Sequence, residues 1–266
     1  MTATLPPSPL PAQPAPRPPV LPMFYRELVA LDPALHQGYG LRPQAQLQAA
    51  QAANAVPLGV SEFVVAASHF PIVFSPQEEN AFPIAVTAIV EGRNLFVNEQ
   101  GQWLEGSYLP AWLRRYPFWL QPDADGQNAQ LSFDPSAGHL VPLQEASDAR
   151  PLFDYQGQAN QALLAVVQLC KLCMADAQQT HAFMQAVQQH QLLIPRQVSV
   201  PLTAAAAPYT LSGFRAIDMD RYRQLPDAVL AEWARNGWAA LVAVHDMSMQ
   251  HNWQRLLALH HQLNNR

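Results

Sequence analysis

In the first half of the chain, apolar residues form short runs separated by turn residues, which is the pattern of short antiparallel strands. Val60–Ala67 is predicted to be a buried strand, and Pro71–Phe74 the next one. Pro83–Val90 and Leu95–Asn98 are apolar runs joined by a short loop that contains Gly92, and this arrangement predicts a β-hairpin. We therefore expect an antiparallel, β-rich N-terminal half.

Residues 157–191 form the longest segment with helical spacing. Apolar side chains recur there every three to four residues, as on the buried face of an amphipathic helix. The segment predicts one long central helix or a pair of helices. The residues of this stripe are Leu163, Val166, Val167, Cys170, Cys173, Met174, Phe183 and Val187.

The C-terminal third mixes both kinds of pattern. Val198–Leu202 and Tyr209–Leu211 predict a second hairpin, and Asp227–Asn236 predicts a helix. Ala239–Met247 is predicted as a buried strand, although a helix fits its apolar run almost as well, and Asn252–Gln262 predicts an amphipathic helix. Strands followed by a helical block and mixed elements indicate an α+β fold.

The first 22 residues have a different composition, with nine prolines between Pro6 and Pro22. Proline lacks an N–H donor and has a fixed φ angle, so such a segment stays extended. Pro11-x-x-Pro14 is one candidate ligand for an aromatic-lined groove in another domain, but we favour a disordered tail. We therefore expect a tail over 1–22 and a single domain over 23–266.

Composition excludes several classes of protein. Hydrophobic residues make up 49% of the chain, enough for a real core. The net charge is -5 and the isoelectric point is about 5.9, which argues against nucleic-acid binding. Phosphate-binding glycine loops and hydrolase or zinc-protease motifs are absent from the sequence, so we expect no cofactor and no metal.

The sequence also bears on location. It has no apolar run long enough for a membrane span. The proline-rich start lacks the basic and apolar regions of a signal peptide. We expect a cytoplasmic protein, with association at the cell surface by a non-classical route as the alternative.

Cys170 and Cys173 form a Cys-x-x-Cys within the predicted central helix. This spacing occurs in redox dithiols and in half of a zinc site. No second pair of Cys or His accompanies it at ligand spacing, and a thioredoxin-like motif would open a helix rather than lie inside one. We favour two core thiols.

The best candidate binding segment is the aromatic and arginine-rich run from Trp103 to Leu120. Tyr, Trp and Arg dominate binding hot spots because they offer large area and directional donors, although aromatic residues at this density also build cores. The partner we expect is a protein or peptide. The candidate residues of this segment are Trp103, Tyr108, Trp112, Arg114, Arg115 and Tyr116.

Glu62 and His245 complete the set of candidates. Glu62 lies beside an apolar run, so if buried it needs a partner, and Arg114 or Arg115 is the obvious one. Alternatively it is a pKa-shifted acid in a pocket, or it faces solvent. His245 beside Asp246 fits either an acid–base or metal half-site or a histidine that is hydrogen-bonded within the fold.

The order of several short motifs resembles the SapC family of bacterial proteins. The resemblance extends from Tyr25 to Leu257 and leaves out the proline-rich tail. The motifs that carry it are Asn54–Pro57, Glu62–Phe63, Phe70–Phe74, Asn94–Val97, Trp103, Tyr108–Phe118, Leu152–Phe153, Leu211–Phe214 and the His245 segment.

The resemblance implies an association with bacterial surface layers and carries over no catalytic residues. A peptide-uptake permease that shares the family's name is unrelated. Two hypotheses follow. The chain is a non-catalytic binding or accessory protein, linked to bacterial cell-surface assembly, that uses the segment 103–120. Alternatively, it is an enzyme or enzyme subunit acting on a peptide or small molecule, with Glu62, Arg115 and His245 converging in a pocket.

Overall fold

The computed structural model describes residues 21–42, 47–77, 79–122, 129–202 and 208–264. The predicted disordered tail therefore lies outside the described residues, apart from its last two positions. Helices and antiparallel sheets are both present, which confirms the α+β fold. The helices are α1 (Pro33–His36), α2 (Phe63–Ala66), α3 (Ala111–Arg114), α4 (Gln161–Gln189), α5 (Met219–Arg223), α6 (Asp227–Arg235) and α7 (Trp238–Asn264).

Within the described residues the strands form three antiparallel sheets. Five strands make the central sheet in the order β10-β11-β4-β5-β3, and the smaller sheets have the orders β1-β7-β6 and β8-β2-β9. The strands are β1 (Val29–Ala30), β2 (Tyr39–Leu41), β3 (Ala55–Pro57), β4 (Ile72–Phe74), β5 (Pro83–Val86), β6 (Phe118–Pro122), β7 (Ala129–Phe133), β8 (Leu140–Pro142), β9 (Arg150–Pro151), β10 (Leu193–Val200) and β11 (Tyr209–Ile217).

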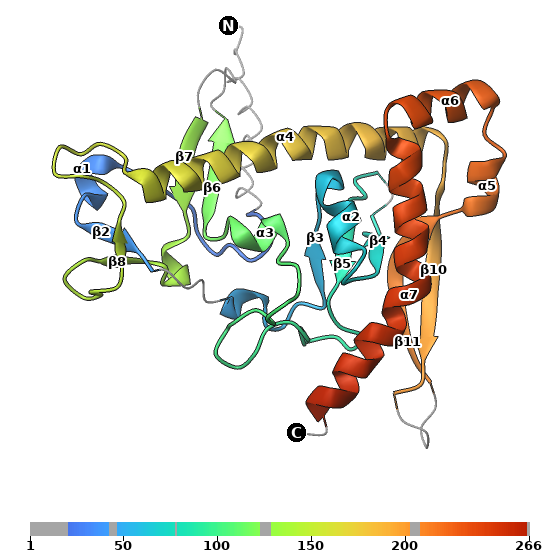
Figure 1. The fold of residues 1–266 in the computed structure, drawn as a ribbon, viewed down its shortest axis with the longest axis horizontal. Coiled ribbons are helices and arrows are strands. Elements are labelled where there is room, and N and C mark those ends of the chain that lie inside the picture. Colours follow the sequence, from blue (N-terminus) through green and yellow to red (C-terminus); the bar gives the residue numbers. More distant parts are fainter. Residues whose placement is uncertain (1–20, 43–46, 78, 123–128, 203–207, 265–266) are drawn as a thin grey trace, which may run out of the picture.

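The central helix α4 joins the two main parts of the hydrophobic core. It is one continuous helix of 29 residues, and the side chain of Asn160 caps it by accepting from the N–H groups of Ala162 and Leu163. In Figure 1 it runs across the top of the molecule, from beside β6 and β7 to the top of α7. Leu163 and Cys170 pack against the β6–β7 sheet, whereas Phe183 and Val187 belong to the core around the central sheet.

The second hairpin is confirmed, because β10 and β11 pair antiparallel from Leu193–Ile217 to Val200–Tyr209. The prediction of a first hairpin, formed by Pro83–Val90 and Leu95–Asn98, is wrong. β5 pairs with β3 on one side and with β4 on the other. Both of its edges are therefore occupied, and residues 95–98 form only the isolated bridge between Val97 and Trp103.

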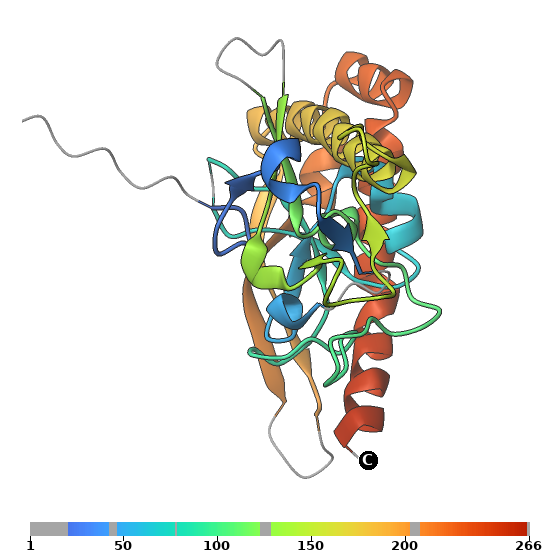
Figure 2. The same cartoon turned by 90° about the vertical axis from the view of Figure 1, so that its left-hand side faces the viewer.

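The predicted strand over Ala239–Met247 is also wrong, because this run is the first part of α7. Val242 is buried in the core around the central sheet, and the buried polar side chains of His245, Ser248 and Asn252 tie the helix to the chain around β4. Ser248 Oγ accepts from the N–H of Ile72 at 2.9 Å, and Asn252 donates to the carbonyl of Phe70 at 2.9 Å. Figure 2 shows α7 running along one side of the molecule for most of its height.

The predicted buried strand over Val60–Ala67 is a 3₁₀ turn, Val60–Glu62, followed by the short helix α2. The side chain of Glu62 accepts from the N–H of Gly59 at 2.9 Å, which favours a turn over an extended chain. The run then buries only one face. Phe63 and Ala66 are fully buried, whereas Val64 is 72% exposed.

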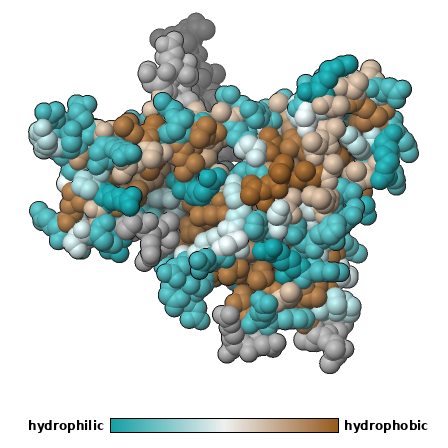
Figure 3. Space-filling model, in the orientation of Figure 1, coloured by the Kyte–Doolittle hydropathy of each residue, from teal (hydrophilic) through white to brown (hydrophobic). Residues whose placement is uncertain are grey.

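Part of the surface around α2 is hydrophobic. On the face shown in Figure 3, hydrophobic side chains gather below α4 and beside α7, where α2 exposes Val64 and Val65. Among the described residues, no helix combines the length and the apolar character that crossing a bilayer requires.

Candidate functional site

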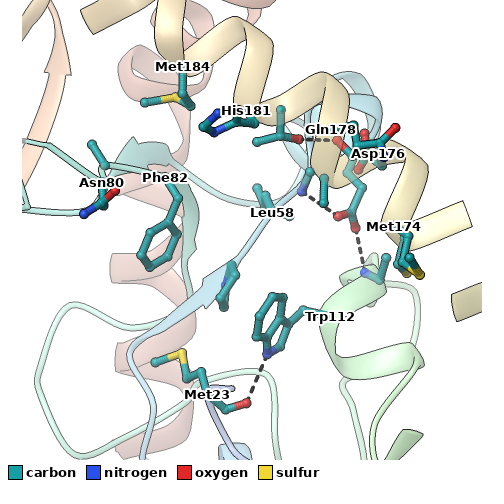
Figure 4. A pocket seen from close by; sticks show the side chains of 18 of the residues that line it. Met23, Leu58, Asn80, Phe82, Trp112, Met174, Asp176, Gln178, His181 and Met184 are labelled. Carbon is teal, nitrogen blue, oxygen red and sulfur yellow. Dashed lines mark hydrogen bonds between the residues drawn. The ribbon is translucent and has the colours of Figure 1, made fainter. Parts of the chain in front are cut away.

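A pocket of about 740 Å³ lies under α4, at the stretch where the helix passes from one part of the core to the other. Its size is in the usual range for ligand sites. α4 forms one wall, and the chain after β3, the turn before β5, α3 and Met23 form the others. Figure 4 shows Asp176, Gln178, His181 and Met184 along α4, Asn80 and Phe82 at one end, and Trp112 and Met23 opposite.

The turn at Gly59 is docked against α4 by two hydrogen bonds. The N–H of Ser61 donates to Asp176 Oδ1 at 3.0 Å, and the N–H of Val60 donates to Thr180 Oγ1 at 3.0 Å. A Cβ atom at Gly59 would lie 1.5 Å from Asp176 Oδ2, so a side chain cannot fit without displacing Asp176. The close approach of the turn to α4 therefore depends on glycine.

The carboxylate of Glu62 connects this turn to α3. Glu62 is 5% exposed and lines the pocket. Its Oε1 accepts from the N–H of Ala111 at 2.6 Å and from the Tyr108 hydroxyl at 2.8 Å, while Oε2 accepts from the N–H of Gly59. Burial, followed by the charge of Glu62, raises the pKa of Tyr108, so this hydroxyl stays protonated and donates.

Neither arginine is the ion-pair partner expected for Glu62. The described residues contain no salt bridge between Glu62 and Arg114 or Arg115. Three hydrogen-bond donors compensate the buried carboxylate instead, which is the other way to stabilise such a charge. Arg114 is exposed and reaches Glu62 only indirectly, because its Nη2 donates to the Tyr108 hydroxyl at 3.1 Å.

Arg115 lines the pocket from the end of α3 and is 9% exposed. Its guanidinium carbon lies 4.2 Å from the ring centre of Trp112 and 4.0 Å from that of Trp119, so both indoles make cation–π contacts with it. Its Nε and Nη2 atoms are buried and have no hydrogen-bond partner among the described residues. The pocket is thus lined by a buried cation, and its Nε and Nη2 atoms lack an acceptor among the described residues.

Three titratable groups that interact with this cation, Cys170, Cys173 and Tyr25, are neutral at pH 7. Burial raises the pKa of Cys170 to about 11, and it also raises the pKa values of Cys173 and Tyr25. The positive charge of Arg115 lowers these values only in part. Both cysteines are free thiols. Cys170 is buried in the core, whereas Cys173 is half-buried and lines the pocket.

The other sequence candidates lie away from the pocket. Trp103 stacks on Phe96 with ring centres 5.5 Å apart, and Tyr116 packs edge-on against Tyr25. His245 is buried at the sheet, where its Nδ1 donates to the carbonyl of Ile72 at 2.8 Å and its Nε2 accepts from the N–H of Ile217 at 3.2 Å. The structure therefore brings Glu62, Trp112 and Arg115 to the pocket, but not His245.

Sequence reasoning missed the contribution of α4 to this pocket. The apolar stripe of the helix is interrupted between Met174 and Phe183, where Asp176, Ala177 and Thr180 take positions on the inward face. That interruption was the available clue, because a helix packed only against a core has no need of a carboxylate there. Within the described part of the chain, no three His, Cys, Asp or Glu residues cluster as metal ligands would.

Comparison with models of known protein families gives a match. The model of the SapC family matches residues 31–256, which is most of the chain. No curated protein and no solved structure matches.

Proposed function

Because the chain belongs to the SapC family, we propose that it is a non-catalytic binding or accessory protein of that family, and that it holds a protein or peptide partner in the pocket under α4. The observation that carries the proposal is the composition of the pocket wall. Part of the aromatic and arginine-rich segment, represented by Trp112, Arg115 and Trp119, faces a pocket of about 740 Å³. These are the residue types that dominate binding hot spots.

The alternative of an enzyme with a Glu, Arg and His pocket receives no support from the geometry. His245 makes both of its ring hydrogen bonds to backbone groups of the central sheet. Both oxygens of Glu62 accept hydrogen bonds from donors within the protein, which stabilises the ionised carboxylate and disfavours its use as a proton acceptor.

An accessory role in bacterial cell-surface assembly is part of the proposal. This part rests on the family, whereas the binding role rests on the pocket. Fractionation of native host cells tests the location, which we expect to be the cytoplasm or, by a non-classical route, the cell surface.

Two alanines of α4 provide a matched pair of variants for testing the binding role. Both side chains are exposed, but Ala177 lines the pocket, whereas Ala175 lies outside the lining. Two residues correspond to about 200° around a helix, so the two side chains point to opposite sides. Ala177→Trp should fill the pocket, and Ala175→Trp should add the same side chain elsewhere.

The experiment is affinity capture from native host extract, followed by mass spectrometry, with the wild type and both variants. We expect the wild type and Ala175→Trp to retain the same partner, and Ala177→Trp to lose it. Equal retention by all three proteins would show that the pocket is not the binding site. Melting temperatures of the two variants within error of each other exclude unfolding as the cause.

A further inference from the structure

Arg115 raises a question that the proposed function leaves open, namely what accepts its hydrogen bonds. A buried charge is normally paired or fully hydrogen-bonded, because leaving it without partners is costly. The Nε and Nη2 atoms of Arg115 are buried and unpartnered, and no described carboxylate lies within ion-pair distance of them. These two N–H groups form one edge of the guanidinium, the edge that binds a carboxylate through two parallel hydrogen bonds.

The protein groups around this edge do not supply a negative charge. Trp112 and Trp119 offer π faces, which do not replace an acceptor for the N–H groups. Cys170, Cys173 and Tyr25 are neutral at pH 7 because burial raises their pKa values. A ligand with a negatively charged acceptor would complete this site.

The rest of the pocket indicates what the ligand carries besides an anionic group. Most of its wall is apolar or aromatic, and a ligand that fills it gains from burying apolar area. The apolar lining residues include Pro57, Leu58, Phe82, Leu120, Met174 and Met184.

The acidic residues of the pocket favour one position for the anionic group of a ligand. Glu62 accepts three hydrogen bonds from the protein, and Asp176 accepts one from the N–H of Ser61. Glu79 is exposed at the rim. An anionic group placed near any of these three would be repelled, so the cation at Arg115 is the one favourable position for it among the described lining residues.

We propose that the pocket binds an apolar carboxylate, with the carboxylate on the Nε and Nη2 edge of Arg115 and the apolar part against the lining under α4. The proposal rests on the function proposed above and names the chemistry of its ligand. A peptide's C-terminus and a free organic acid both have this chemistry. Trp112, whose ring lies over the guanidinium, is only half-buried.

Isothermal titration calorimetry with two pairs of probes tests the proposal. One pair is octanoate and octanamide. The other is N-acetyl-Ala-Ala-Leu with a free carboxylate and the same peptide with a C-terminal amide. We expect at least one carboxylate to bind the wild type with a Kd at least tenfold lower than that of its amide. A preference in the peptide pair alone identifies a peptide C-terminus, and a preference in the octanoate pair identifies a free acid.

Three variants assign the preference to the site. Arg115→Met should abolish it. Arg114→Met removes the neighbouring exposed arginine and should preserve it. Arg115→Lys keeps the positive charge but lacks the two parallel N–H donors of the guanidinium, so it should weaken the preference for the carboxylate. It replaces Arg115→Met in the test if that variant does not fold.

The proposal is overturned if neither carboxylate binds better than its amide, or if the preference survives in Arg115→Met. A third outcome is that the amide binds as well as the carboxylate, and that Ala177→Trp abolishes this binding. The pocket would then remain a binding site, and only the assignment of a carboxylate to Arg115 would be refuted.

Discussion

At the scale of single residues, Glu62 shows how the structure stabilises a buried carboxylate without an ion pair. Its oxygens accept from two backbone N–H groups on separate segments, at Gly59 and Ala111, and from the Tyr108 hydroxyl. Sequence reasoning singled out Glu62 as a carboxylate that needs compensation if it is buried. It could not identify the compensating groups, because backbone donors leave no trace in the sequence.

Glu62→Gln should lower the free energy of unfolding by about 1–3 kcal/mol. The amide has one acceptor oxygen, and its NH₂ group would face a backbone donor, leaving buried groups unsatisfied. Urea denaturation measures the change. Glu79→Gln is the control, because Glu79 is exposed and its substitution should stay within about 0.5 kcal/mol. A loss of less than 0.5 kcal/mol in Glu62→Gln would refute this account of the carboxylate.

His245 should make stability depend on pH. Burial lowers its pKa to about 4 from an ordinary 6.5, and its Nε2 already accepts the N–H of Ile217. Between pH 6.5 and 4 the unfolded chain binds a proton that the folded protein does not, so stability falls as the pH falls through this window. His245 should account for a loss of about 2 kcal/mol between pH 7 and pH 5.

The measurement is urea denaturation at several pH values, compared between the wild type and His245→Gln. Burial also lowers the pKa values of His69, His139 and His260, so only the difference between the two proteins reports on His245. The variant should be less stable at pH 7 and lose less stability on acidification. Parallel pH profiles for the two proteins would show that His245 is not responsible.

At the scale of elements, the sequence correctly predicted the helices and strands whose type follows from the residues of the element itself. The stripe of α4 and the pairing of β10 with β11 follow from spacing and turn residues. The runs 60–67 and 239–247 were assigned to the wrong type, because short apolar runs fit either type and distant contacts decide between them. For residues 60–67 the deciding contact is the docking of the turn on Asp176 and Thr180 of α4.

Gly59→Ala tests that docking. The added Cβ would lie 1.5 Å from Asp176 Oδ2, so Asp176 must move away and its bond to Ser61 is lost. We expect the free energy of unfolding to fall by about 1–3 kcal/mol, as for other overpacked sites. Gly38→Ala is the matched control, because a Cβ at Gly38 meets nothing within 4 Å. Equal melting temperatures for the two variants would contradict the docking.

At the scale of the whole molecule, α4 belongs to both main parts of the core, so neither part keeps its packing if this helix unfolds. We therefore propose that residues 23–266 form one cooperative unit. Thermal unfolding followed by circular dichroism and by tryptophan fluorescence should give coincident single transitions. Two resolved transitions would indicate separate domains.

The candidate site is also a property of the whole molecule. Arg115 and Trp112 were visible in the sequence as a dense aromatic and arginine-rich run, but the opposite wall comes from α4, more than fifty residues later. A single sequence contains no information that brings these segments together. The sequence therefore pointed to residues of one pocket wall but not to the wall that α4 provides.

Photo-crosslinking in native host cells tests the central claim, that the pocket under α4 is the binding site, most directly. A benzoylphenylalanine replaces Ala177, which lines the pocket, or Ala175, which lies outside the lining on the same helix. The account predicts a specific crosslinked partner from position 177 and none from position 175. The same crosslinks from both positions, or crosslinks from position 175 alone, would contradict it.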